Sequence, residues 1–297
     1  MTKNEKIFDL LYENGLAWEA NKVPLYATLN EGTNKETVTV QTDTYGVFRS
    51  DNNELLGTCK DRYQVFQNKE LAETIVDAAG SLNLEVKKGG TLQGGRKTFL
   101  QVALEDAVVG NSGIKRNLTA LNSHDGSSAI GFGTTNTVVV CTNTFYQAMR
   151  GLTKIRHTES YSRRVKDAVE SIKMAITGEN LLIDNFKRMS DTKIKDDKFV
   201  IDLVSKILNV NHNEKSSTRK ANQVQTMAQD IYTDIGIHGR NLWGLFNGIT
   251  RYTNHSATSK DKSLDSVMVG QGARMNEQAF NQIMIEVENS LNTSVLV

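Results

Sequence analysis

The side chains best suited to chemistry stand together in Ser123-His124-Asp125-Gly126-Ser127-Ser128, which contains the three residue types of a hydrolase triad. A triad is assembled from residues that face one another across a fold, so adjacent side chains on a turn cannot align as nucleophile, base and orienting acid. The chain also lacks the G-x-S-x-G nucleophile elbow. We therefore predict a structural turn, in which Asp125 accepts local backbone N–H bonds and Gly126 adopts a positive φ angle.

A second group of side chains surrounds the glycine-rich segment from Gly89 to Gly95. Four cations lie beside it, namely Lys87, Lys88, Arg96 and Lys97. The segment is neither a P-loop nor a dinucleotide fingerprint, because a strand rather than a helix follows it. One interpretation is a glycine-rich hairpin or bulge at a sheet edge. The other is a basic turn whose cations and backbone N–H groups hold nucleic-acid phosphates.

The densest basic stretch runs from residue 150 to 166. It comprises Arg150, Lys154, Arg156, His157, Arg163, Arg164 and Lys166, flanked by Tyr146 and Tyr161. Cations interleaved with aromatic rings suit single-stranded nucleic acid, in which bases stack and phosphates pair with cations. An exposed helix start with two half-buried tyrosines has the same pattern. Residues 150–220 carry 16 Lys and Arg against 10 Asp and Glu, although the net charge of the whole chain is only +1.

Composition and spacing exclude several classes of protein. The five histidines form no HExxH motif and the two cysteines, Cys59 and Cys141, are not clustered, so we predict no metal and no cofactor. The apolar runs are far shorter than the ~20 residues of a membrane helix, and residues 1–15 resemble no secretion signal. These features predict a cytoplasmic protein that makes no membrane contact.

The pattern of elements predicts an α+β fold, with an antiparallel-rich sheet and packed helices followed by a mainly helical C-terminal half. We expect a mixed α+β domain over residues 1–150 and a helical region over residues 151–297. Within the first part, residues 37–142 are expected to form one sheet, with a helix from Asn68 to Gly80 on one face and a loop over 105–117. Within the second, helices are expected over 161–209, 215–235, 236–252 and 276–291, with a polar loop over 254–265.

Several strings resemble the ordered signatures of a phage and plasmid protein family known as domain of unknown function 932. They are Gly57-Thr58-Cys59-Lys60-Asp61-Arg62-Tyr63-Gln64-Val65-Phe66-Gln67-Asn68, Leu92-Gln93-Gly94-Gly95-Arg96-Lys97-Thr98-Phe99-Leu100, Leu121-Asn122-Ser123-His124-Asp125-Gly126-Ser127-Ser128-Ala129, Val139-Val140-Cys141-Thr142-Asn143-Thr144, Arg156-His157-Thr158, Trp243-Gly244-Leu245-Phe246-Asn247-Gly248-Ile249-Thr250-Arg251-Tyr252 and Gly270-Gln271-Gly272-Ala273-Arg274. The resemblance runs from about residue 45 to 280. It implies a mobile-element setting, and this setting narrows the function to DNA metabolism or interference with host defence.

Our first hypothesis is a non-enzymatic, homo-oligomeric protein that handles single-stranded DNA during phage or plasmid recombination or replication. The expected phosphate contacts are Arg62, Lys87, Lys88, Arg96, Lys97, Arg156, Arg163 and Arg164, and the expected stacking residues are Tyr63, Tyr146 and Tyr161. If the strands 97–104 and 134–142 are neighbours, Arg96 and Lys97 should share one surface with Arg156, Arg163 and Arg164.

Two alternatives remain open from the sequence. One is an interaction protein that binds and blocks a host nuclease or restriction system, which requires no catalytic residue. The other is an enzyme centred on His124, Asp125 and His157. The first alternative predicts a stable complex with a host defence protein in the absence of DNA. The second predicts that single substitutions at His124, Asp125 or His157 abolish the activity and leave folding intact.

Overall fold

A computed structural model of the chain describes the backbone of residues 2–31, 36–127, 130–138, 144–146, 161–210, 218–257 and 259–294. By its internal contacts the chain divides into two compact units. The first unit takes Met1–Ala103, Leu118–Phe132 and Gly151–Met174; the second takes Leu104–Asn117, Gly133–Arg150 and Ala175–Val297. Each unit is therefore assembled from segments that are distant in the sequence.

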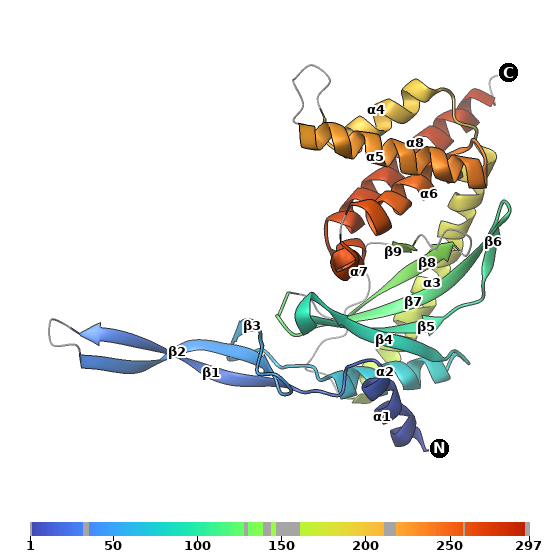
Figure 1. The fold of residues 1–297 in the computed structure, drawn as a ribbon. Helices are drawn as coiled ribbons and strands as arrows, with labels where there is room; N and C mark the ends of the chain where they lie inside the picture. Colours follow the sequence, from blue (N-terminus) through green and yellow to red (C-terminus); the bar gives the residue numbers. More distant parts are fainter. Residues whose placement is uncertain are drawn as a thin grey trace. The chain divides into compact units, whose positions relative to one another are not determined.

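Strands dominate the N-terminal half of the chain and helices the C-terminal half (Figure 1), which confirms the α+β prediction. The strands are β1 (Ala20–Glu31), β2 (Glu36–Arg49), β3 (Leu55–Lys60), β4 (Val86–Leu92), β5 (Lys97–Ala103), β6 (Ala107–Val109), β7 (Ser112–Ser123), β8 (Gly131–Val138) and β9 (Thr144–Tyr146). The helices are α1 (Lys3–Glu13), α2 (Asn68–Gly80), the 3-10 turn η1 (Gln93–Gly95), α3 (Tyr161–Asp191), α4 (Asp197–Ile207), α5 (Thr218–His238), α6 (Leu242–Arg251), the π-helical turn η2 (Tyr252–Ser256), α7 (Lys260–Val269) and α8 (Gln271–Ser294).

The strands form two sheets, so the prediction of a single sheet over residues 37–142 is wrong. The smaller sheet has the order β1-β2-β3, and the larger has the order β4-β5-β7-β8-β9 with β6 paired to β7. The pairs β1–β2, β2–β3, β4–β5, β6–β7 and β8–β9 are antiparallel. The chain leaves the smaller sheet after β3 and passes through α2 before β4 begins the larger one, which explains the separation.

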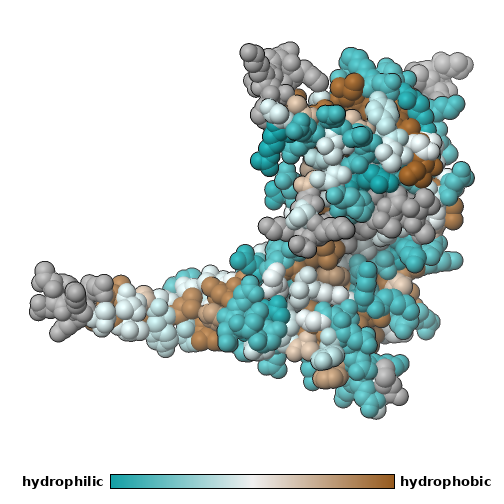
Figure 2. Space-filling view, viewed as in Figure 1, coloured by the Kyte–Doolittle hydropathy of each residue, from teal (hydrophilic) through white to brown (hydrophobic). Residues whose placement is uncertain are grey.

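A long two-stranded ribbon makes up most of the smaller sheet. β3 pairs only with residues 44–48 of β2, so β1 and β2 beyond that point pair only with each other in this sheet. The register places Leu29 opposite Val38 and Ala27 opposite Val40. Alternation therefore collects these apolar residues on one face. Leu29, Val38 and Val40 are exposed, and Figure 2 shows apolar surface along this ribbon.

The segment 105–117, which the sequence indicates to be a loop, contains β6 and the first half of β7. A tight turn at Gly110, whose φ angle is +55°, joins these two strands. Val109 and Ile114 are fully buried. The charged pairs at 105–106 and 115–116 interrupt the apolar alternation, and this interruption obscures the strands in the sequence.

Helix α2 has the predicted bounds. Gln67 is its N-terminal capping residue, and the Gln67 N–H donates to the carboxylate of Glu70 at 2.9 Å. Asn68 instead lies inside the first unit, 2% exposed. Its side chain is thereby free for contacts with other segments of the first unit.

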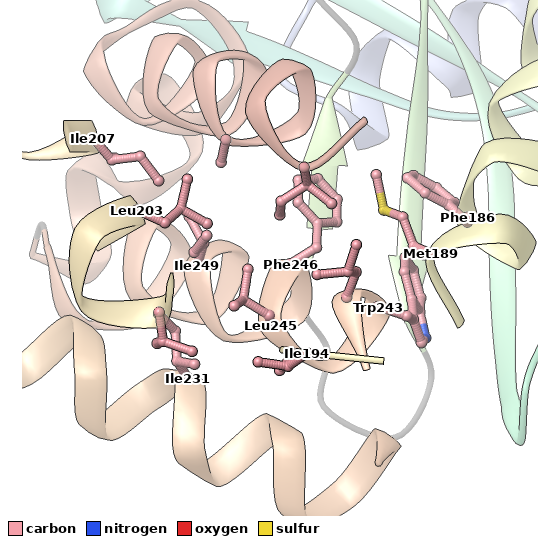
Figure 3. Packing of buried hydrophobic residues seen from close by; sticks show 14 of the residues in the cluster. Phe186, Met189, Ile194, Leu203, Ile207, Ile231, Trp243, Leu245, Phe246 and Ile249 are labelled. Atoms are coloured by element: carbon pink, nitrogen blue, oxygen red, sulfur yellow. The ribbon is translucent and has the colours of Figure 1, made fainter. Parts of the chain in front are cut away.

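The core of the second unit is formed mainly by α3, α4, α5, α6 and α8 (Figure 3). Helix α6 is buried from Leu242 to Thr250 because it lies closely against α5. A Cβ at Gly248 would lie 2.2 Å from Ile231 Cα, so only glycine permits this approach. The predicted polar loop over 254–265 is partly wrong, because α7 begins at Lys260.

Among the described residues, every helix is too short or too polar to cross a bilayer.

Candidate functional site

Three segments with separate family-like signatures meet in the first unit. Tyr63, between β3 and α2, donates its hydroxyl to the carbonyl of Ser123 at 3.0 Å. Lys97 Nζ donates to Ser127 Oγ at 2.6 Å. The N–H of His124 donates to the carbonyl of Arg96 at 2.8 Å. We call this group the turn cluster: Tyr63, Arg96, Lys97 and the turn Ser123–Ser127.

The turn itself has the predicted geometry. Asp125 Oδ1 accepts the N–H of Ser127 at 2.9 Å and the hydroxyl of Ser123, and Gly126 has a φ angle of +73°. Partial burial raises the pKa of Asp125, but hydrogen bonds from Ser123 and Ser127 and the charge of Lys97 outweigh it and hold the pKa below its usual range. Asp125 is therefore an ionised structural acceptor rather than a proton donor at neutral pH.

Strand β3 approaches the turn very closely. A Cβ at Gly57 would lie 2.7 Å from the Cα of Asp125, so glycine is required there. The same turn lies next to the ring of Tyr63, since a Cβ at Gly126 would be 3.9 Å from Tyr63 Cε2. Burial raises the pKa of the Tyr63 phenol to about 12. Tyr63 consequently stays a neutral hydrogen-bond donor across the physiological range.

His124 points into the interior and does not form a triad with its neighbours. It is fully buried, and its Nε2 lies 2.9 Å from Asn68 Oδ1. The Asn68 amide donates to the carbonyls of Leu16 and Trp18 at 3.1 and 3.2 Å, so its oxygen is the acceptor and His124 carries the proton on Nε2. The imidazole also packs 5.1 Å from the ring of Trp18, centroid to centroid.

Arg49, a cation outside the predicted phosphate-binding set, completes this packing. Its guanidinium stacks 4.4 Å from the centroid of Trp18, pairs with Asp51 at 2.6 Å and donates to the carbonyl of Gly94 at 3.4 Å. The stack Arg49–Trp18–His124 thus connects β2 to the turn cluster. No motif marks Arg49 in the sequence, because it ends an ordinary strand.

The predicted phosphate-binding residues are only partly brought together. Arg62, Lys88 and Arg96 are exposed, and in the described part of the chain the structure assigns no ion pair to them. Lys87 pairs with Glu85 at 2.5 Å. Gly89 and Gly90 lie within β4, so the turn is confined to Gln93–Gly95 and Arg96.

The strand adjacency from which we expected a common surface of five cations is wrong. β7 lies between β5 and β8, so the two strands that should have been neighbours are not adjacent. Arg164 pairs with Glu70 at 3.2 Å and lies 5.1 Å from the ring of Phe66. Arg163 is exposed at the start of α3. Arg156, His157 and the side chains of Tyr146 and Tyr161 lie outside the described residues.

A separate polar relay in the second unit has the residue types of a triad. Ser112 Oγ lies 2.7 Å from His238 Nδ1, His238 Nε2 lies 3.4 Å from Asp234 Oδ1, and Arg251 Nε lies 2.5 Å from Asp234 Oδ2. Ser112 is 3% exposed and Asp234 is 0% exposed, so the serine and the aspartate of the relay are buried from solvent. The relay therefore ties β7 to α5 and α6 rather than offering a nucleophile to a substrate. Sequence reasoning misses it because its members are distant in the chain.

The described residues contain no group of three or more His, Cys, Asp or Glu side chains placed to hold a metal ion. Neither a curated protein nor a solved structure matches the chain. A family model described as a domain of unknown function (DUF932) matches residues 55–280, a range that contains the whole turn cluster. Because this match covers most of the chain, the protein belongs to the DUF932 family.

Proposed function

We propose that the protein binds single-stranded DNA at the surface of the turn cluster, without catalysing a reaction on it. The observation that carries the proposal is that two separate segments, each carrying cations, contact the turn Ser123–Ser127. Tyr63, which follows the exposed Arg62, contacts Ser123, and Lys97, which follows the exposed Arg96, contacts Ser127. Cations gathered in this way suit a run of phosphates.

The backbone beside these cations supports the same proposal. Gln93, Gly94 and Gly95 have φ angles of +52°, +69° and +98°. These angles form a tight turn that ends at Arg96. Gln93 and Gly94 are exposed, so a phosphate can approach this backbone directly beside Arg96 and Lys97.

A single strand suits this surface better than a duplex. The half-buried ring of Tyr63 borders the turn, and an aromatic edge among cations favours unpaired bases. Asp125 and the Arg49–Asp51 pair reduce the local positive charge. We therefore expect moderate affinity that decreases steeply with salt. The proposal places the protein in the host cytoplasm, where phage or plasmid strands are exposed during recombination and replication.

The proposal includes self-association through the β1–β2 ribbon. Leu29, Val38 and Val40 are exposed on the apolar face that they form with Ala27, and β1 carries no charged residue from Val23 to Asn30. Two identical ribbons can cover one another across a two-fold axis. Leu29→Glu with Val40→Glu should reduce the molar mass measured by light scattering. An unchanged mass at the same concentration argues against this contact.

The test of the proposed function is a salt titration of binding to a fluorescent oligo-thymidine. Arg96→Ala with Lys97→Ala should weaken binding and reduce the log–log salt slope by about 1.4, since each single-strand phosphate contact contributes ~0.7. The matched control is Lys195→Ala with Lys198→Ala, which removes the same charge from the second unit. If the wild-type protein does not bind at low salt, the proposal fails and a host defence protein becomes the partner to seek.

A further inference from the structure

The second unit contains a polar hollow of about 520 Å³ that the proposed function does not use. It lies where the end of α4, the start of α5, the turn η2 and the junction of α7 with α8 meet. Its polar lining includes Asn209, Arg219, Gln223, Gln271, Arg274 and Gln278. The volume is in the range of small-molecule sites and is far larger than a single inorganic anion needs.

The charge of this hollow is one-sided. Among the described residues that line it, Arg219 and Arg274 are cations and there is no carboxylate. No ion pair is assigned to either arginine in the part of the chain that the structure describes. Both arginines are exposed side chains that line the same hollow. A bound anion can therefore pair with two guanidinium groups, whose geometry matches that of phosphate.

The glycine-rich junction of α7 and α8 shapes the hollow. A Cβ at Gly270 would lie 2.9 Å from the Cα of Ser266, and one at Gly272 would lie 3.0 Å from Ser266 Oγ. The N–H of Gly272 donates to that same hydroxyl at 3.1 Å. The tight junction places Arg274 in the first turn of α8, a helix of 24 residues, whose positive dipole end adds to the charge of the arginines.

The remaining polar lining consists of amides. The side chains of Gln223 and Gln271 have no hydrogen bond assigned within the described residues, and Gln278 Nε2 donates to the carbonyl of Lys206 at 3.4 Å. Amide groups donate and accept at once, so they suit the mixed edges of a sugar or a base. We propose that this hollow binds a phosphate-bearing small molecule of nucleotide size, with its phosphate between Arg219 and Arg274 and its remaining polar groups against the glutamines.

The test uses the full chain and isothermal titration calorimetry with three probes: inorganic phosphate, nucleoside monophosphates and oligo-thymidine. The wild-type protein should bind at least one nucleoside monophosphate more tightly than inorganic phosphate. Arg219→Ala with Arg274→Ala should weaken that binding about tenfold or more, because charge-assisted hydrogen bonds are lost. The matched control is Arg188→Ala with Arg240→Ala, which removes two arginines of the same unit that do not line the hollow and should leave the affinity unchanged.

Circular dichroism of both double variants verifies that they fold. Arg274→Lys keeps the positive charge, so this variant should bind the nucleotide more tightly than the double alanine variant. Absence of binding by any nucleoside monophosphate, or equal weakening in the control, overturns the proposal. The proposal is also overturned if oligo-thymidine is the only probe that binds and its binding is lost in Arg219→Ala with Arg274→Ala. The two arginines would then contact a DNA strand rather than a small molecule. Arg96→Ala with Lys97→Ala should keep nucleotide binding, so failure here is distinguishable from failure of the proposed function.

Discussion

The side-chain oxygen of Asn68, at the start of α2, lies 2.9 Å from Nε2 of His124, in the turn after β7. Asn68 simultaneously donates to the carbonyls of Leu16 and Trp18. One buried amide therefore joins the segment before β1 and the turn cluster to α2. Arrangements of this kind are costly to disturb, because a buried polar group that loses its partner keeps its desolvation penalty.

We predict that His124→Ala lowers the free energy of unfolding by about 3 kcal/mol, since it opens a cavity beside Trp18 and leaves Asn68 Oδ1 unpaired. Urea denaturation followed by tryptophan fluorescence measures this loss. The exposed residue Lys88 supplies the control, and Lys88→Ala should change stability by less than about 0.5 kcal/mol. A folded, fully stable His124→Ala protein that has lost DNA binding would instead indicate a direct functional role for the imidazole.

We predict that Gly→Ala substitutions destabilise the protein at two positions and stabilise it at two others. Gly126→Ala should cost about 1 kcal/mol because its φ angle is +73°, and Gly57→Ala should cost about 1–3 kcal/mol because its Cβ would meet the Asp125 backbone. Gly178 and Gly236 lie in helices with open space around them, so alanine there should stabilise by about 1 kcal/mol. Thermal denaturation of the four variants compares them. Equal effects at all four positions would contradict the close approach of β3 to the turn.

We predict that the Ser112–His238–Asp234–Arg251 relay stabilises the second unit. Asp234→Ala should cost about 3–5 kcal/mol, because Arg251 then remains partly buried without its partner. Burial raises the pKa of Asp234, but hydrogen bonds from His238 and Arg251 outweigh it and lower the pKa overall. The stabilisation is therefore complete above the ordinary aspartate range near pH 4 and is lost as the pH falls through the lower native value. Urea midpoints between pH 3 and 7 should show a smaller acid-induced loss for Asp234→Ala than for the wild type.

Glu179 should show the reverse dependence on pH. It is 0% exposed, and burial raises its pKa although hydrogen bonds from Thr134, Arg116 and Asn136 oppose the shift. A raised native pKa means that stability is highest below the ordinary glutamate range and decreases as the pH rises through the native value. Glu179→Gln should remove this decrease.

The Glu179→Gln variant should also keep its stability at neutral pH within about 1 kcal/mol, because the Asn136 amide can rotate and present its unpaired oxygen to the new amide. Arg116→Ala is the contrasting variant and should cost about 3 kcal/mol, since it leaves the Glu179 carboxylate buried without its cation. A pH-independent loss of the same size in both variants would contradict this assignment.

Local sequence patterns predict the elements whose apolar residues recur periodically and the turn whose residue types favour a tight turn. Helix α2 has an apolar face that recurs at helical spacing, and Asp125-Gly126 has the residues that a tight turn needs. The sequence does not predict β1 because Pro24 interrupts it, and the structure has a register shift between Pro24 and Tyr26. β6 is only three residues long, too short for periodicity to show.

The candidate site depends on distant contacts that spacing cannot reveal. The family-like strings around Tyr63, Arg96 and Ser123 suggest importance, but only the fold shows that they touch. The order of strands in the larger sheet decides which cations can share a surface, and β7 enters between β5 and β8. The sequence also does not show which cations pair with carboxylates, and Arg164, which pairs with the distant Glu70, is an example.

Hydrogen exchange of the full chain, with and without oligo-thymidine at low salt, tests directly whether the turn cluster holds single-stranded DNA. Exchange should be slower in residues 93–97 and 123–127 when the strand is bound, with residues 280–290 of α8 unchanged as an internal reference. The protected segments should return to their free rates at high salt, because phosphate contacts are displaced by ions. Binding of the strand with no change at either segment, or no binding at all, would contradict the claim that the turn cluster holds single-stranded DNA.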